Sequence, residues 1–237
     1  MSNSVSASVG ALIVVGIRWT DRLIGLISTI ILARLLAPDD FGIIAMASLL
    51  IGLIEVLLDM GVNITLIQNK NATQLDFDAA WTLRLIQSGI ATVVIFAAAY
   101  PAADYFHDAR VTLVVQALAL SILILGFENI GVVSFQKKME FGREFRFFFG
   151  KRIIGFMVTV AVAWWLHSYW ALVVGTVAGR LAGVVLSYAM HPMRPGLSLV
   201  RMPAMLSFST WNLVRGISNY LGENLHRALV GRREDSG

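Results

Sequence analysis

The chain has 237 residues, of which 57% are hydrophobic and only 14% are charged, with a mean hydropathy of +0.72 and a net charge of +4. Soluble domains are usually about a quarter charged, so this composition excludes an ordinary soluble protein and indicates an all-α, polytopic integral membrane protein. The chain contains no cysteine, which excludes a disulfide framework, a thiolate metal site and a cysteine nucleophile. The polar start, residues 1–10, lacks the basic region of a signal peptide, so we expect no cleaved signal.

The apolar blocks of the sequence predict the membrane spans. A helix needs about 20 mostly apolar residues to cross a bilayer, and the sequence predicts six such spans and the start of a seventh. They cover residues 9–35, 41–67, 82–104, 111–135, 148–167, 169–190 and 206–231. Pro38 is expected to end the first helix, Asp39 or Asp40 to cap the second, and Thr73 or Asp76 to cap the third.

The positions of lysine and arginine predict the orientation, because cytoplasmic loops carry an excess of both. If the N-terminus is cytoplasmic, only Arg34 and Arg110 fall in outer loops. The inner loops then hold Lys70, Lys137, Lys138, Arg143, Arg146, Lys151, Arg152, Arg194 and Arg201. We therefore predict a multi-pass protein with its N-terminus in the cytoplasm.

Charged residues lie inside several predicted spans, although a charge at bilayer depth costs about 3 kcal/mol or more. Arg18, Asp21 and Arg22 share one face of the first helix and leave an excess of positive charge. The second helix has an acidic face with Glu55 and Asp59. The third, fourth, sixth and seventh helices each have one such residue, which are Arg84, Glu128, Arg180 and Arg215 in that order.

Two interpretations of these nine residues remain open. They are structural ion pairs and snorkelling side chains, or they line one water-filled path for a substrate. A cavity with a basic wall suits an anionic, amphiphilic cargo, because arginine binds phosphate in a bidentate manner. We treat all nine as candidate substrate-path residues.

Two other stretches carry weaker signals. Gly175, Gly179 and Gly183 recur every four residues on the sixth span and predict close helix packing. Residues 136–152 are basic and aromatic and resemble an interfacial segment held by anionic membrane lipid. An ordinary basic loop is the alternative, and its position between two spans argues against nucleic acid as a partner.

No catalytic or cofactor motif is visible in the sequence. It has no phosphate-binding glycine loop and no nucleophile elbow, and its four histidines lack metal-ligand spacing. We therefore expect no enzyme activity, no cofactor and no metal site.

Residues 31–68 resemble the start of the oligosaccharide flippases and polysaccharide exporters of the multidrug/oligosaccharidyl-lipid/polysaccharide superfamily. The matching positions are Arg34, Leu35, Leu36, Pro38, Asp40, Phe41, Gly42, Asp59, Gly61, Leu66, Ile67 and Gln68. Residues 129–147 are similar to the segment after the fourth helix of that family, and residues 170–199 to its sixth helix and following loop.

The resemblance implies that the chain flips polyprenyl-pyrophosphate-linked oligosaccharide across the bacterial inner membrane for lipopolysaccharide or exopolysaccharide synthesis. Related lipid II flippases have arginines on the first helix of a cationic cavity, and Arg18 and Arg22 occupy that place. The implied partners are the lipid-linked oligosaccharide, membrane lipids, and a second lobe or other polysaccharide-synthesis proteins.

The resemblance also implies a domain division, because the family has two lobes of about six helices each. Residues 1–192 would form the N-terminal six-helix lobe, residues 193–205 a cytoplasmic linker, and residues 206–237 the first helix of a second lobe. The sequence stops where an eighth helix is expected, so we expect a fragment, a truncated half or a divergent tail.

Two alternative functions remain open besides flipping. A cation-coupled drug exporter of the same superfamily should have acidic cavity walls, and Arg18 and Arg22 argue against it. A non-transporting scaffold of a polysaccharide-synthesis complex is favoured by the half length. An enzyme of polyprenyl-linked sugar synthesis ranks below both, because no catalytic constellation is visible.

Overall fold

The computed structural model describes residues 19, 22–58, 61–69 and 71–203, and these contain helices and no strand. A helix over residues 22–35 comes first. The others are α2 (Pro38–Leu58), α3 (Val62–Gln68), α4 (Gln74–Phe106), α5 (Arg110–Gly126), η1 (Ile130–Val132), α6 (Val133–Lys137), α7 (Phe141–Leu166) and α8 (Trp170–Met190).

Three helices in the described part, α4, α7 and α8, are long and apolar enough to cross a membrane. A fourth span results if α5 and the segment Ile130–Lys137 are counted as one helix bent by 68°. These findings confirm the predicted all-α membrane protein. The seventh predicted span and the beginning of the first lie outside the described residues.

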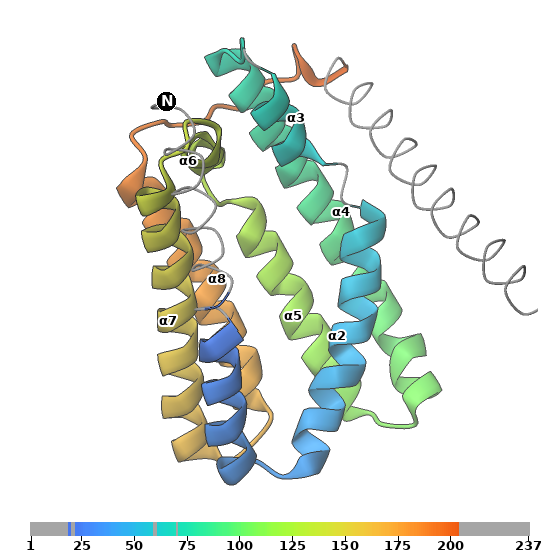
Figure 1. The fold of residues 1–237 in the computed structure, drawn as a ribbon. Helices are drawn as coiled ribbons and strands as arrows, with labels where there is room; N and C mark the ends of the chain where they lie inside the picture. The colour runs from blue at the N-terminus through green and yellow to red at the C-terminus, as the bar shows by residue number, and fades with distance from the viewer. Residues whose placement is uncertain (1–18, 20–21, 59–60, 70, 204–237) are drawn as a thin grey trace, which may run out of the picture.

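The helices form a bundle in which α4 packs beside α5 and α7 beside α8 (Figure 1). The turns at residues 36–37, 107–109 and 167–169 lie together at one end, called here the turn end. Helices α3 and α6 and residues 191–203 lie at the opposite end, called here the α6 end. The largest apolar cluster, with Ile43, Ile95 and Val114, joins α2, α4 and α5.

Two predicted spans differ from the structure because each contains a break. The second is divided into α2 and α3, and Gly61 adopts a left-handed φ of 64° before α3, a conformation that costs glycine little. The fourth ends at Gly126 rather than continuing to residue 135. The prediction of a continuous helix was wrong there, because Asn129 turns the backbone and caps η1 by accepting the Gly131 N–H.

Helix starts also differ from the predicted ones, because hydropathy marks the apolar part of a helix and not its polar first turns. Helix α4 begins at Gln74, where Thr73 and Asp76 form a capping box, so the predicted cap is confirmed. Helix α7 begins at Phe141 rather than near residue 148.

Asp40 accepts the backbone N–H of Ala37 at 3.1 Å and that of Tyr169 at 3.2 Å, which ties the start of α2 to the α7–α8 turn.

The predicted glycine packing on the sixth span is confirmed. A Cβ atom on Gly155 of α7 would lie 3.1 Å from the carbonyl oxygen of Gly175 and 3.2 Å from the Cα of Gly179. A Cβ on Gly175 would overlap the Thr159 hydroxyl. Small residues thus let α7 and α8 approach backbone to backbone, which is the main way that helices gain packing energy in lipid.

The segment after α8 crosses the α6 end and binds α4. The Gly196 N–H donates to Asp78 Oδ1 at 3.0 Å, and the Ser198 N–H donates to Thr82 Oγ1 at 2.9 Å. These residues belong to the predicted linker 193–205. The division into residues 1–192, 193–205 and 206–237 stays a prediction, since the last part lies outside the described residues.

Candidate functional site

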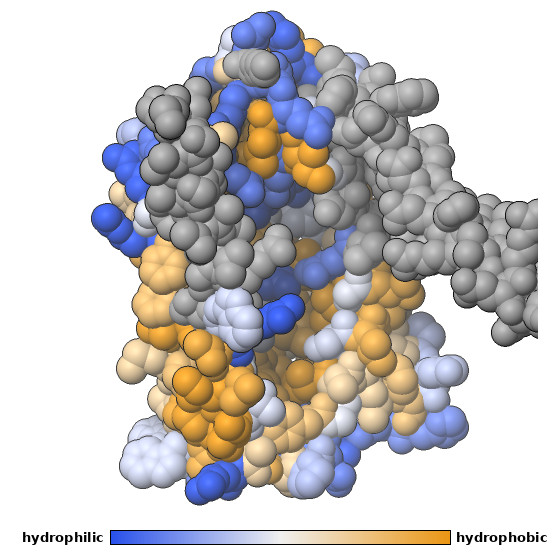
Figure 2. Space-filling view, viewed as in Figure 1, coloured by the Kyte–Doolittle hydropathy of each residue, from blue (hydrophilic) through white to orange (hydrophobic). Residues whose placement is uncertain are grey.

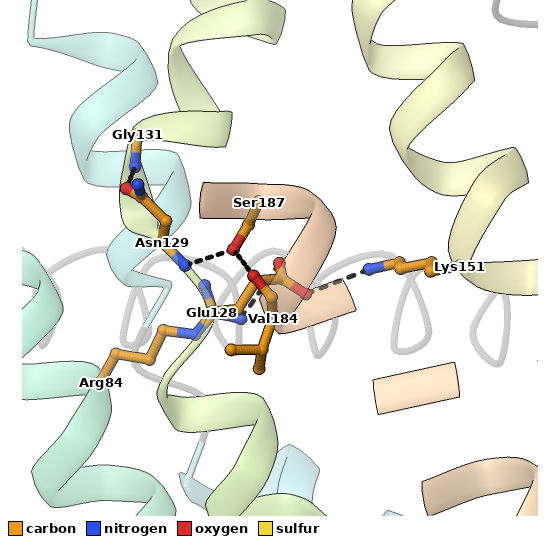
Figure 3. Close-up of polar contacts among 7 residues, drawn as sticks. All are labelled: Arg84, Glu128, Asn129, Gly131, Lys151, Val184 and Ser187. Atoms are coloured by element: carbon orange, nitrogen blue, oxygen red, sulfur yellow. Dashed lines mark hydrogen bonds and ion pairs between the residues drawn. The ribbon is translucent and has the colours of Figure 1, made fainter. Parts of the chain in front are cut away.

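Glu128 joins three helices at the point where α5 ends (Figure 3). Its Oε1 lies 3.5 Å from Arg84 Nη2 of α4, and its Oε2 lies 3.4 Å from Lys151 Nζ of α7. Glu128 is only 4% exposed. A Cβ on Gly183 of α8 would come within 3.0 Å of Glu128 Oε2, so the absence of a side chain there leaves room for the carboxylate.

Lys151 is held by more than its carboxylate partner. Its Nζ lies 4.7 Å from the centre of the Phe147 ring and 4.6 Å from that of Phe148. Aromatic faces attract a cation, and more strongly when water is excluded. Lys151 was predicted from the sequence as a basic residue of an inner loop, and this role was not predicted. The signal that could have found it is the spacing of three and four residues to Phe148 and Phe147, which is contact spacing on a helix.

The residue after Glu128 fixes the bend to α8. The Asn129 N–H donates to Ser187 Oγ at 2.9 Å, and Asn129 Nδ2 donates to the Met193 carbonyl at 2.7 Å. Asn129 Oδ1 accepts the Gly131 N–H at 2.8 Å, and Asn129 is fully buried. Glu128 is therefore held in place by backbone geometry as well as by its ion pairs.

His191 lies beside this bend, outside the predicted spans. Its Nδ1 accepts the Met193 N–H at 3.2 Å, so Nε2, 3.0 Å from Ser134 Oγ, carries the proton. Burial lowers the pKa of His191 below its ordinary value, and Lys138, Arg143 and Arg194 lower it further, while Glu140 acts in the opposite direction. A protonated ring would lose the Met193 contact and face these cations.

We expect the folded protein to lose stability as the pH falls from about 7 to about 5, because His191 binds a proton more readily when unfolded. The sign follows from the depressed pKa: the unfolded state binds more protons, so lower pH favours it. Thermal unfolding of the wild type and of His191→Gln across this range measures the effect. The variant should show a shallower dependence on pH, and equal slopes would contradict the assignment.

A second ion pair joins α2 and α8 near the middle of the bundle. Arg180 Nη2 lies 3.2 Å from Glu55 Oε1, and the side chains are 21% and 39% exposed. Both residues line a hollow of about 460 Å³, called here the first hollow. Its other polar lining residues are Asn63, Arg84, Gln87 and Ser88.

The first hollow is a charged space inside an otherwise apolar bundle. Figure 2 shows hydrophilic surface in a hollow between hydrophobic flanks in the middle part of the molecule. The two ion-pair groups together contain three cations, Arg84, Lys151 and Arg180, and two carboxylates, Glu55 and Glu128. These five described residues, which we call the charged site, therefore have an excess of one positive charge.

The structure brings together four of the nine candidate residues, as the pairs Arg84–Glu128 and Glu55–Arg180. Arg22 is exposed at the start of the helix over residues 22–35 and does not line the first hollow. Arg18, Asp21, Asp59 and Arg215 lie outside the described residues. Pairing between helices and a polar hollow occur together here, so both interpretations of the charges have support.

These features define a class: a helical membrane protein with ion-paired charges around a hollow between its spans. The chain belongs to the family of polysaccharide biosynthesis proteins, whose pattern it matches over residues 31–236. This family membership confirms the resemblance noted in the sequence.

Three relatives show how far the similarity extends. The chain is 22% identical to the lipopolysaccharide biosynthesis protein WzxC of Escherichia coli (strain K12), over 98% of this chain and 46% of the relative. It is 24% identical to an uncharacterised membrane protein in the cps region of Klebsiella pneumoniae, over 88% of this chain and 44% of the relative. It is 21% identical to the teichuronic acid biosynthesis protein TuaB of Bacillus subtilis (strain 168), over 75% of this chain and 38% of the relative.

The chain spans less than half the length of these relatives. No solved structure matches it.

Proposed function

We propose that this chain is part of a flippase that moves polyprenyl-pyrophosphate-linked oligosaccharide across the bacterial inner membrane. The observation that carries the proposal is the first hollow, where Arg84 and Arg180 border a polar space between apolar helices. Charges at this depth are costly, and they usually face a bundle interior or a water-filled cavity, where they often mark a substrate path. A pyrophosphate linked to a lipid and a sugar needs such a path, because its charges cannot cross hydrocarbon unaided.

The net charge of the site supports an anionic cargo. Glu55 and Glu128 offset only two of the three cations, and guanidinium groups match phosphate oxygens in a bidentate manner. In this proposal Arg18 and Arg22 on the first helix add further phosphate contacts, and Asp21, Asp59 and Arg215 belong to the same path. The cargo moves without covalent change, so the chain acts as a transporter and not as an enzyme.

The distribution of charge and aromatic residues supports a cytoplasmic N-terminus. Lys138, Arg143 and Arg194 are exposed at the α6 end, and basic residues favour the cytoplasmic side. Tyr105, Trp164 and Trp165 are exposed near the turn end, where an aromatic belt would meet the outer interface. We therefore place the α6 end in the cytoplasm.

The length of the relatives supports a two-lobed protein, of which this chain supplies one lobe and the start of the next. Residues 1–192 form the first lobe in this proposal, and the first hollow is its contribution to a cargo path shared with a second lobe. The linker, residues 193–205, would connect the two on the cytoplasmic side.

The proposal predicts that Arg180→Gln lowers surface polysaccharide by about tenfold or more, because a charge-assisted contact to phosphate is lost. The measurement is complementation of a strain that lacks the gene, with surface polysaccharide and membrane protein level determined together. Arg110→Gln is the matched control, because Arg110 pairs with Asp108 at the turn end, away from the hollow. Full polysaccharide from Arg180→Gln at a normal protein level would contradict the proposal.

A further inference from the structure

A second hollow of about 210 Å³ lies next to the first, and Glu55 and Arg180 line both. The second hollow is also lined by Ser48 of α2, Leu118 of α5 and Thr176 of α8. On each of these helices its residues lie nearer the turn end than those of the first hollow. The two hollows thus lie one after the other along the bundle, with the Glu55–Arg180 ion pair between them.

The space around this ion pair is open on the side of the second hollow. Gly52 lies about one turn before Glu55 on α2 and lines the second hollow. A Cβ atom on Gly52 would meet no atom within 4 Å. An ion pair that only holds two helices together would be packed on its sides. This one has room for the Glu55 side chain to move.

Two hydrogen-bond donors, one of them on Arg180 itself, have no partner within the described part of the chain. Arg180 Nη1 and Gln87 Nε2 are both buried and make no hydrogen bond to any residue that the structure describes, although buried polar atoms are nearly always paired. Both residues line the first hollow, as does Arg84. This set of donors is complementary to an oxyanion that enters the first hollow.

We propose that the Glu55–Arg180 ion pair is a gate between the two hollows, and that a phosphate-type oxyanion opens it. The anion binds Arg180 and Gln87 from the first hollow and takes the place of Glu55 on the guanidinium. Bidentate binding uses both terminal nitrogens of arginine, and Glu55 holds one of them, Nη2. The anion repels the freed carboxylate, which moves away. The two hollows then form one continuous space. The identity of the anion rests on the proposed function; the position of the gate does not.

The absence of cysteine makes the gate testable by thiol labelling. Leu118→Cys reports on the second hollow and Asn63→Cys on the first. The complete protein, in lipid nanodiscs, is treated with an uncharged, water-soluble methanethiosulfonate. Leu118 is buried and Asn63 is exposed, so we expect Leu118→Cys to react more slowly than Asn63→Cys. Adding Glu55→Gln should raise the Leu118→Cys rate by about tenfold, the effect of losing a partly buried ion pair, and leave the Asn63→Cys rate unchanged.

Sodium pyrophosphate is the probe for the anion, with sodium chloride at equal ionic strength as its control. Pyrophosphate should speed the labelling of Leu118→Cys in the presence of Arg180, and it should add nothing in Arg180→Gln. The reversed pair, Glu55→Arg with Arg180→Glu, should restore slow labelling, which guards against a misfolded single variant.

An unchanged Leu118→Cys rate in Glu55→Gln would overturn the gate. A faster rate in Glu55→Gln without any response to pyrophosphate would overturn the exchange by an oxyanion. Neither result depends on transport. A protein whose gate responds as expected but that fails to support surface polysaccharide would instead refute the proposed function.

Discussion

Replacing Glu128 with alanine is expected to destabilise the protein by about 2–4 kcal/mol. The change removes both ion pairs at once and leaves Arg84 and Lys151 facing each other beside a bend between helices. Complete burial would favour the upper part of the range, and the partial exposure of Arg84 and Lys151, 19% and 25%, favours the lower part. The midpoint of thermal unfolding of the detergent-solubilised protein measures the loss.

The matched control is Glu140→Ala. Glu140 pairs with Arg143 at 2.9 Å on the exposed surface of the α6 end, and an exposed pair contributes about 0.5 kcal/mol or less. The double variant Glu128→Gln with Lys151→Met should recover part of the stability, because it leaves fewer unpaired charges. A loss in Glu128→Ala no greater than in Glu140→Ala would show that Glu128 does not hold the helices together.

Replacing Gly175 with valine is the second large effect, with an expected loss of about 3 kcal/mol from overpacking. The new Cβ would overlap the Thr159 hydroxyl and lie 3.1 Å from the Gly155 carbonyl oxygen. Both contacts belong to the crossing of α7 and α8, where the neighbouring backbone cannot move aside without separating the helices.

Gly89→Val on α4 is the control, because a Cβ at Gly89 meets no atom within 4 Å. Both variants introduce the same β-branched side chain into a helix, so a comparison of their melting temperatures isolates the packing at the crossing. Equal shifts would mean that helix propensity, and not the α7–α8 contact, sets the cost.

The sequence predicts the fold where a span is a single uninterrupted helix. The sixth predicted span, residues 169–190, agrees with α8 to within one residue. The fourth span was predicted as continuous, because its apolar block contains no sign of the bend at Glu128 and Asn129. That bend arises from contacts of Asn129 with Ser187 of α8 and with Met193 just after it. Such contacts depend on residues 58 and 64 positions apart in the chain.

The candidate site could be predicted as a set of residues but not as pairs. Arg84, Glu128, Glu55 and Arg180 all stand out as charges on predicted spans. Their pairing depends on which helices are neighbours, which periodicity does not reveal. Lys151 was missed because basic residues near an apolar block are normally assigned to a loop, and the α7 helix extends beyond its apolar part.

The central claim, that the charged hollow carries an anionic lipid-linked sugar across the membrane, is tested most directly by transport in proteoliposomes. The complete protein is reconstituted with a fluorescent, short-chain polyprenyl-pyrophosphate oligosaccharide, and the fraction that reaches the opposite leaflet is followed by quenching from outside. We predict transport by the wild type, and transport at least about tenfold slower in Arg180→Gln. Equal rates in the two proteins, or the same rate in liposomes without protein, would contradict the account.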